Sequence, residues 1–599
     1  MKNIYSVAII SILATILAVG FYLPILNEIH NLGIQDWDQN FAWSEVTRLS
    51  ILRYRQFPFW NPYQCGGLVH FANPQIGILS IQTLFTLVFG TVVGIKISVV
   101  LNSMIGFIGF YLLSMQYGLS KKASVVASIL FSFNGAVSSA LSTGMIPFTG
   151  LAYIPYVLYF YNKGVYSFRW TLVSALVYAL SYYHGYHIPL LFSVFISIQT
   201  IARCIYNRSL MHGIQFALFS LFFLVLSAPK LLLSLQLISV TPSYIPDLSG
   251  YRPDHLLHFL FSGRQSLYGT GGMIHGYTWG TDENSLYLGI LPGIFFLFFF
   301  YKNNVAVRKR TILLATGICM TLLMLGSLYT YSPYAWLREL PIFSSFRVAQ
   351  RFRFVFLIPF ALIAGLGFDR FIIVFSNRNL RRIVSVCFIA IIYADLTYFG
   401  FTKFLHASLI IHDTVPYSDD TRFSQRNNET DGNDISYSIN RIPKNLEGSK
   451  NFSPWSRDFQ NIRDNTGNLN CYTAPVALST VSSSSSEWYN GEWYTKYKSF
   501  EITQNYWSPN TMSYTMKHVQ FQKKYDVLII NQNYYPGWFV EIDGNTNPVL
   551  NYEGLIAAEI HSTMKHVTFK FMPYRWMIMK FIQLFDTSPG DFSASFRTV

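Results

Sequence analysis

The chain has 599 residues, of which 51% are hydrophobic, 17% aromatic and only 12% charged. Its apolar residues come in repeated runs of about 17–25, the length of a helix that crosses a bilayer, which excludes an ordinary soluble protein. The formal net charge of +14 would suggest nucleic acid as a partner only in a soluble chain. We therefore expect a multi-pass protein of the inner (plasma) membrane that contacts the lipid bilayer and no nucleic acid.

Apolar runs, taken in chain order, predict the membrane-spanning helices. The first run, Tyr5–Pro24, lacks a small-residue cleavage site and is expected to be a retained span. Residues 75–90 are apolar but short, so we expect a re-entrant or interfacial segment there. The expected fold is an α-helical polytopic membrane protein with about 11–13 transmembrane helices. The spans after the first are expected at 94–117, 122–141, 145–162, 168–184, 186–203, 212–238, 285–301, 310–328, 354–374 and 381–400.

The basic residues predict the orientation of these helices, because Lys and Arg gather in the cytoplasmic loops of membrane proteins. Here they cluster at 121–122, 163–169, 203–208, 302–310 and 378–382. If these clusters are cytoplasmic, the opposite loops are external. The external parts are then 26–74, 142–144, 184–187, 239–284, 329–353 and the region from residue 401 onward.

The character of the sequence changes after the last predicted span. Asn, Ser, Asp and Thr dominate over 401–500, and YDVLIINQNYYPGWFVEIDG (525–544) alternates as strands around turns do. The apolar stretch 573–585 is too short for an ordinary span and is expected to be truncated, interfacial or a short anchor. The sequence therefore predicts a transmembrane domain over 1–400 with a large first external loop over 26–74, a C-terminal β-rich extracytoplasmic domain over 401–572, and a tail over 573–599.

External loops that carry arginine depart from the positive-inside pattern. One reason is an anionic group held at the outer interface, such as the phosphate of a lipid carrier, which a guanidinium binds through two parallel hydrogen bonds. For any single arginine the alternative is a salt bridge to an external carboxylate or contact with anionic headgroups. We favour phosphate binding for the clusters together: Arg48, Arg53 and Arg55 in the first loop, Arg252 and Arg264 in the large loop, and Arg338, Arg347, Arg351 and Arg353 in the loop over 329–353.

Two acids, Asp36 and Asp38, follow the first span in the first external loop. A carboxylate there can act as a general base that deprotonates an acceptor hydroxyl. The alternative is helix capping, because acids stabilise helix N-termini and Asp36 precedes a plausible helix. On that helix, Glu45 is expected to pair with Arg48 at helical spacing.

Histidines in the external loops are further candidates. His255 and His258, with Asp254 beside them, can contact an acceptor or a phosphate. His184 and His187 have a spacing that suits a shared metal ion, but no third ligand is evident, so we favour hydrogen bonding at the membrane edge.

One lysine and several tryptophans are also notable. Lys230 lies within a predicted span, and it is either functional or reaches to the external interface. Trp60 is expected to anchor at a membrane interface. The tryptophans expected to pack the β-core, with sugar stacking as the alternative, are Trp488, Trp493, Trp507 and Trp538.

Several short motifs follow one another along the chain. They are Asp36-x-x-Gln39, Phe57-Pro58-Phe59-Trp60-Asn61-Pro62, Gly66-Gly67, Asn73-Pro74-Gln75, TDENSLYLG (281–289), SFRVAQRFRFVFLIPFALIAGLGFD (345–369) and NYYPGWFVEIDG (533–544). This ordered set, which covers nearly the whole chain, resembles the bacterial YfhO-like membrane proteins, a family of the wider GT-C glycosyltransferase class.

The resemblance implies a fold and a mechanism. Enzymes of the GT-C class place an acidic residue in the first external loop, beside a cavity open to the outer leaflet, and use a polyprenyl-phosphate sugar as donor. Carried onto this chain, the acid is Asp36 or Asp38, and Glu283 positions the acceptor or the base. The arginines implied for the donor phosphate are Arg347, Arg351 and Arg353, with Arg48 and Arg55 of the first loop as further candidates.

The sequence thus predicts a glycosyltransferase that moves a sugar from a polyprenyl-phosphate donor to a cell-envelope glycan, glycolipid or protein on the outer face. No cofactor is expected, and the need for a divalent metal is left open. The alternative is a non-enzymatic transporter or flippase of lipid-linked glycans, which would not need Asp36 or Asp38 as a base.

Overall fold

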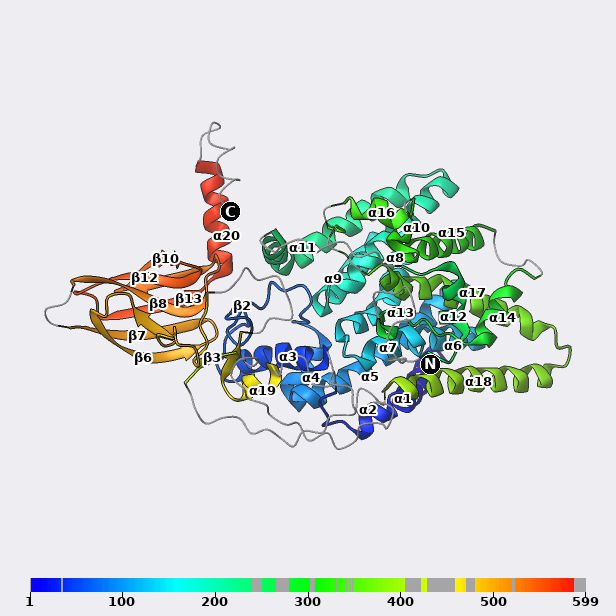
Figure 1. The fold of residues 1–599 in the computed structure, drawn as a ribbon. Coiled ribbons are helices and arrows are strands. Elements are labelled where there is room, and N and C mark those ends of the chain that lie inside the picture. The colour runs from blue at the N-terminus through cyan, green and yellow to red at the C-terminus, as the bar shows by residue number, and fades with distance from the viewer. Residues whose placement is uncertain are drawn as a thin grey trace.

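Figure 1 shows the computed structural model, in which a bundle of helices lies beside a β-rich domain. The chain is an α-helical multi-pass membrane protein with a C-terminal β-rich domain. The structure describes residues 2–33, 36–239, 250–265, 280–301, 307–329, 331–340, 342–344, 346, 348–404, 422–427, 458–469, 480–519 and 523–586.

The helices of the bundle follow the chain in order. The first half contains α1 (Lys2–Phe21), α2 (Leu23–Asn27), α3 (Asp36–Leu52), α4 (Ile81–Phe89), α5 (Thr91–Gln116), α6 (Lys121–Ser132), α7 (Gly135–Ser142), the 3₁₀ helix η1 (Ile146–Tyr153), α8 (Ile154–Gly164), α9 (Phe168–His184), α10 (His187–Asn207) and α11 (Met211–Ser239). The second half contains α12 (Pro253–Phe261), α13 (Thr281–Asn284), α14 (Ile290–Phe298), α15 (Val307–Met324), η2 (Gly326–Leu328), α16 (Pro333–Arg338), η3 (Ala349–Phe352), α17 (Arg353–Ile373) and α18 (Arg378–Phe404).

Length and apolar composition identify the helical segments that can cross a membrane. Two apolar helices, Ala8–Phe21 and Thr311–Met324, are shorter than the 18 residues required of a span. The six described segments that meet both criteria are Thr91–Gln116, Lys121–Ser142, His187–Asn207, Met211–Ser239, Ala349–Ile373 and Arg378–Phe404.

Several predicted spans are broken or shortened. The span predicted over 122–141 is divided between α6 and α7 at Asn134. The Asn134 Nδ2 donates to the Leu130 carbonyl at 3.1 Å, and its Oδ1 accepts from the Val137 amide at 3.1 Å, so one side chain ends α6 and caps α7. In the segment 75–90, α4 has nine residues. Their rise of about 14 Å is less than half of a hydrocarbon core of about 30 Å, so α4 does not cross it alone.

The C-terminal domain is built from two antiparallel sheets that share one apolar core. One sheet has the strand order β10-β9-β13-β7-β6 and the other β11-β12-β8-β5. Tyr514, Ile530 and Phe569 enter the common core from both sheets. The strands are β5 (Trp493–Thr495), β6 (Phe500–Ser508), β7 (Thr511–His518), β8 (Tyr525–Asn533), β9 (Trp538–Ile542), β10 (Asn545–Pro548), β11 (Leu550–Tyr552), β12 (Leu555–His561) and β13 (His566–Phe571).

Smaller elements join the two parts of the molecule. The pair β1 (Trp60–Asn61) and β2 (Leu68–Val69) lies in the first loop, and β3 (Ser424–Arg426) pairs in parallel with β4 (Thr466–Asn468). Helix α19 (Asp458–Arg463) packs on α3, and α20 (Pro573–Asp586) follows β13. The Tyr574 hydroxyl of α20 donates to the Pro229 carbonyl of α11 at 2.9 Å, so the C-terminal helix contacts the bundle.

The first loop inserts into the β-rich domain. The Trp60 side chain is completely buried there, with ring centroids 5.3 Å from Trp538 and 5.0 Å from Phe571. Its Nε1 donates to Gln532 Oε1 at 2.9 Å. The prediction of a membrane anchor at Trp60 is therefore wrong, because partners far along the chain provide the apolar contacts and the hydrogen bond that a bilayer interface would supply.

Candidate active site

A carboxylate–guanidinium pair lies at the centre of the candidate site. Arg351 of η3 contacts Glu283 of α13 with Nε at 2.9 Å from Oε1 and 3.2 Å from Oε2, and its Nη2 also donates to Oε1. The Glu283 side chain is 1% exposed and the Arg351 side chain 19%, so Arg351 is the member that a ligand can reach. Among the described residues, nothing accepts a hydrogen bond from its Nη1.

A second guanidinium lies beside this pair. Arg353, at the start of α17, is completely buried, with Nη2 at 2.5 Å from the Asp282 carbonyl oxygen and 4.0 Å from Glu283 Oε2. Its Nε and Nη1 are buried without a hydrogen-bond partner in the ranges that the structure describes. Unused donors on a buried cation favour an anionic group nearby.

Asp36, the first residue of α3, interacts electrostatically with this cluster. Burial, followed by the negative charges of Asp282 and Glu283, raises the pKa of Asp36 to about 7, against the opposing effect of Arg351. Burial and Glu283 also raise the pKa of Asp282 to about 6, although Arg353 opposes this shift. A carboxyl group with a pKa near neutrality suits a general base.

Close backbone packing fixes the start of α3. Gly144 has a φ of +88°, and a Cβ there would lie 2.2 Å from the Trp37 nitrogen, so this position accepts only glycine. Asn40 Nδ2 donates to the carbonyl oxygens of Gly144 and Asp36, both at 2.9 Å. The loop after α7 therefore positions the helix that carries Asp36.

Two buried lysines hold the first loop near its two ends. Lys96 of α5 donates to the carbonyl oxygens of Glu28 at 2.6 Å and Asn31 at 2.5 Å, just before α3. Lys230 of α11 donates to the carbonyl oxygen of Ile76 at 2.5 Å. Lys230, for which the sequence predicts either a functional or an interfacial role, thus contacts the backbone just after the first loop.

Asp38, the other candidate acid, has different neighbours. Its Oδ2 accepts from the Asp458 amide at 2.9 Å, and its Oδ1 accepts from the Phe459 amide at 3.3 Å. These are the first two amides of α19, whose donors are not satisfied within the helix, so Asp38 caps it. The structure places Asp36 in the ionic cluster and Asp38 at the junction with the C-terminal part.

Aromatic side chains surround Arg351. The Phe148 ring centroid lies 5.3 Å from the guanidinium carbon, which is a cation–π geometry. The His187 ring lies 4.9 Å from Phe148 and 4.1 Å from Tyr186. Sequence reasoning missed Phe148 and Tyr186, since no local motif marks them and η1 and α10 bring them to η3 only in the folded chain.

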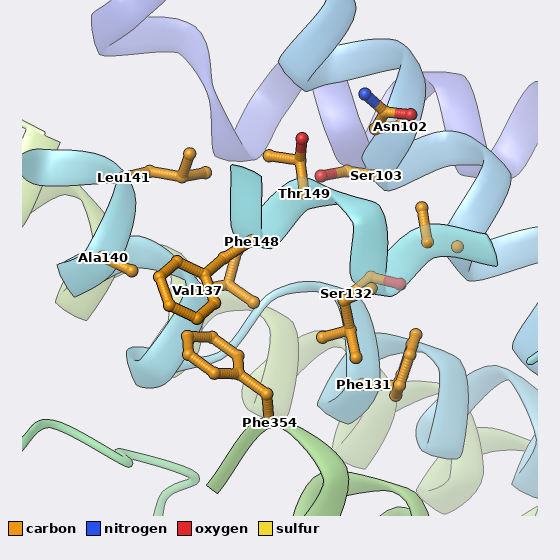
Figure 2. A pocket seen from close by; sticks show the side chains of 13 residues that line it. Asn102, Ser103, Phe131, Ser132, Val137, Ala140, Leu141, Phe148, Thr149 and Phe354 are labelled. Carbon is orange, nitrogen blue, oxygen red and sulfur yellow. The ribbon is translucent and has the colours of Figure 1, made fainter. Parts of the chain in front are cut away.

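A small pocket lies next to Phe148. Figure 2 shows the rings of Phe148 and Phe354 near each other, with the polar side chains of Asn102, Ser103 and Thr149 above them. The pocket has a volume of about 30 Å³. That is room for about two water molecules and is too small for a sugar ring, so the accessible side of Arg351 is the better place for a substrate.

The first-loop arginines lie away from the cluster. Arg48 pairs with Glu45 Oε1 at 3.4 Å, as the helical spacing predicts. It lies twelve residues after Asp36 on α3, a distance of about 18 Å along the helix axis. Arg55 is exposed beyond the end of α3, with a φ of +52°. The structure therefore does not bring Arg48 into contact with Arg351, and Arg347 lies outside the described residues.

The histidines of α12 lie on a neighbouring helix. His255 Nε2 is 3.6 Å from Asp254 Oδ2, and His258 is exposed. Tyr251, just before α12, donates from its hydroxyl to the Asn284 carbonyl at 2.6 Å, so α12 borders α13. Within the described ranges, no group of three or more His, Cys, Asp or Glu residues is arranged to hold a metal ion.

Comparison with known proteins finds similarity in fold only. No family model and no curated protein matches the sequence. Arabinofuranosyltransferase AftD from Mycobacteria is 12% identical with a TM-score of 0.41, and the match covers 67% of this chain but only 27% of AftD. ArnT from Cupriavidus metallidurans, bound to undecaprenyl phosphate, is 13% identical with a TM-score of 0.38, covering 66% of this chain and 75% of ArnT.

The Archaeoglobus fulgidus oligosaccharyltransferase, in complex with Zn and sulfate, is 12% identical with a TM-score of 0.38, covering 66% of this chain and 53% of that protein. With TM-scores below 0.5 for all three, we argue the function from the residues of the chain itself.

Proposed function

We propose that the chain is a membrane glycosyltransferase of the GT-C class. It transfers a sugar from a polyprenyl-phosphate donor to a cell-envelope glycan, glycolipid or protein acceptor on the outer face of the inner membrane. The observation that supports this most directly is the Asp36 carboxyl group, with a pKa raised to about 7, beside the Glu283–Arg351 ion pair. The order of motifs that resembles the YfhO-like proteins is a second, independent support.

In the proposed reaction, an acceptor hydroxyl oxygen attacks the anomeric carbon of the donor sugar. A new glycosidic bond forms, the bond between that carbon and the phosphate oxygen breaks, and the electron pair leaves with the polyprenyl phosphate. Asp36 takes the hydroxyl proton, and the accessible donor of Arg351 stabilises the charge on the leaving phosphate. Glu283 fixes the position of Arg351 by accepting hydrogen bonds from the Nε and Nη2 atoms of Arg351.

The first prediction concerns Asp36. Replacing it with asparagine, D36N, removes the proton acceptor but keeps the shape, so we expect sugar transfer to fall by about 10²–10⁴-fold, the usual contribution of a general base. Transfer of labelled sugar from a polyprenyl-phosphate donor to endogenous acceptors in membranes measures it. The matched control is D543N, because Asp543 is an exposed turn residue of the β-rich domain with a φ of 47°, a conformation that asparagine adopts readily.

If the chain is instead a transporter or flippase, the D36N substitution should not change its activity. Wild-type transfer in D36N, with full-length protein present at equal amount, would contradict the proposed role of Asp36. If the wild-type chain itself shows no transfer but changes the sidedness of a labelled lipid-linked glycan in vesicles, the transporter is the better description.

A further inference from the structure

A second hollow lies on the β-rich domain, apart from the ionic cluster. It has a volume of about 500 Å³, which is in the range of ligand-binding pockets. Its lining includes Arg422, Phe423, Tyr489, Glu492 and Trp493. Aromatic rings and two oppositely charged side chains thus share one concave surface.

Hydrogen bonds fix the frame of this hollow, which we call the β-domain pocket. Glu492 Oε1 accepts from the Tyr489 hydroxyl at 2.9 Å and from the Gln425 amide at 2.7 Å. Asn531 of β8 donates from Nδ2 to the Ser482 carbonyl at 2.8 Å and accepts from the Ser482 amide at 2.9 Å. A pocket held in this way loses little conformational freedom when a ligand binds.

The sequence around the pocket has the composition of a recognition loop. Residues 482–493 read SSSSSEWYNGEW, and Trp488 is 81% exposed next to Tyr489. Trp and Tyr provide large, rigid contact area, whereas Ser, Asn and Gly provide adaptable hydrogen bonding. The prediction that Trp488 packs the β-core is therefore wrong, because its side chain is exposed while Trp60 and Trp538 lie in that core.

The chemistry of these side chains favours a carbohydrate. Ring faces at Tyr489 and Trp493 suit the C–H faces of a sugar ring, while the Glu492 carboxyl and the Arg422 guanidinium can accept from and donate to hydroxyl groups. A bilayer interface also binds aromatic and basic side chains, so the test below includes lipid vesicles. An extended peptide would add to the edge strand β5, which has only three residues.

We propose that the β-domain pocket is a carbohydrate-binding site, with a neutral oligosaccharide as its ligand class. The binding of a glycan in this pocket is proposed independently of the glycosyltransferase activity. The further idea, that the pocket presents an acceptor glycan to Arg351 and Asp36, rests on the proposed function. The pocket is near the first loop, because Gln425 Nε2 donates to the Pro62 carbonyl at 3.1 Å. A bound glycan would therefore lie at the junction between the β-rich domain and the loop that carries Asp36.

The test measures binding of maltohexaose, cellohexaose and chitohexaose to the purified full-length chain by calorimetry, without any donor. We expect saturable binding of at least one of them, and a decrease of about tenfold or more in affinity for Y489A, as expected for removal of a central aromatic contact. E492Q, which keeps the shape of the side chain, should also weaken binding. W336A is the matched control, since Trp336 lies on α16 and is already 65% exposed.

The outcomes separate this proposal from the glycosyltransferase proposal. D36N should bind the same oligosaccharide with wild-type affinity, whether or not it transfers sugar. The pocket proposal is overturned if none of the three probes binds saturably, or if Y489A and E492Q, both with wild-type thermal unfolding, bind as tightly as W336A. It is equally overturned if Y489A instead abolishes binding to phosphatidylglycerol vesicles, which would identify a membrane-binding surface.

Discussion

At the scale of single residues, the two aspartates of the first loop illustrate how environment determines chemistry. Asp36 and Asp38 are two positions apart on one helix, so their side chains point to different sides of it. Asp36 lies beside two other acids and a guanidinium, whereas Asp38 accepts two backbone amides. The surroundings of Asp36 allow its carboxyl group to gain or lose a proton near neutral pH. The Asp38 carboxylate instead has a structural role, because it accepts hydrogen bonds from the backbone of α19.

The raised pKa of Asp36 predicts how stability depends on pH. Between its ordinary value of 3.8 and about 7, the folded chain keeps a proton that the unfolded chain has released. The contribution of this group to stability therefore falls as pH rises through that window. We expect D36N to unfold at a higher temperature than wild type at pH 8 but at a similar temperature at pH 4.

Thermal unfolding in detergent at the two pH values measures this effect, and D543N should show no pH-dependent difference from wild type. A D36N variant that is less stable than wild type at pH 8 would mean that Arg351 stabilises the ionised carboxylate more than burial and the neighbouring acids disfavour it.

At the scale of elements, α19 is a short helix whose N-terminus depends on a residue from α3. Asp38 is 5% exposed, and the amides that it caps belong to residues about 420 positions later in the chain. A six-residue helix has little stability of its own, so this contact helps to decide whether α19 forms.

The third prediction follows from this cap. D38A removes the carboxylate that accepts from the Asp458 and Phe459 amides, so we expect local destabilisation by about 1–2 kcal/mol. Hydrogen exchange at the Asp458 and Phe459 amides measures it, and both should exchange faster in D38A. D38N keeps one acceptor oxygen and serves as the matched control with a smaller effect. Unchanged exchange in D38A would show that other contacts maintain α19.

The sequence was informative about elements wherever a local pattern determines structure. Apolar runs predicted the membrane helices, and the alternation over 525–544 predicted strands, which are β8 and β9. The family resemblance implies that an acid of the first loop, Glu283 and Arg351 share one site, and the structure places Asp36 near these two residues. Asn134 breaks the helix between α6 and α7, although Lys121–Ser142 as a whole keeps the length and composition of a membrane span.

At the scale of the whole molecule, the first loop joins the bundle to the β-rich domain. The amide of Trp60 donates to Asn510 Oδ1 at 3.0 Å, and Asn533 Nδ2 donates to the carbonyl oxygens of Cys65 and Gly67. Such partners could not be predicted from the sequence, since they lie more than 400 residues away and no local pattern marks them. The residues next to Trp60 in the sequence predict a membrane interface, whereas its side chain is buried in the β-rich domain.

The fourth prediction concerns this junction. W60A removes a completely buried indole from the β-domain core, and we expect a loss of about 3–5 kcal/mol in stability of that part. Limited proteolysis of the full-length chain should then cut within the β-rich domain at protease concentrations that leave wild type intact. W336A again serves as control. A wild-type digestion pattern in W60A would show that the junction does not depend on this side chain.

The long separation between Trp60 and Asn510 has a consequence for biosynthesis. A ribosome that has just added Trp60 has 450 residues still to add before Asn510, which accepts from the Trp60 amide, is present. During this interval the apolar side chains of the loop lack their final neighbours, a condition that favours aggregation or capture by chaperones. Chains that terminate before Asn510 would leave the Trp60 amide without this hydrogen-bond acceptor.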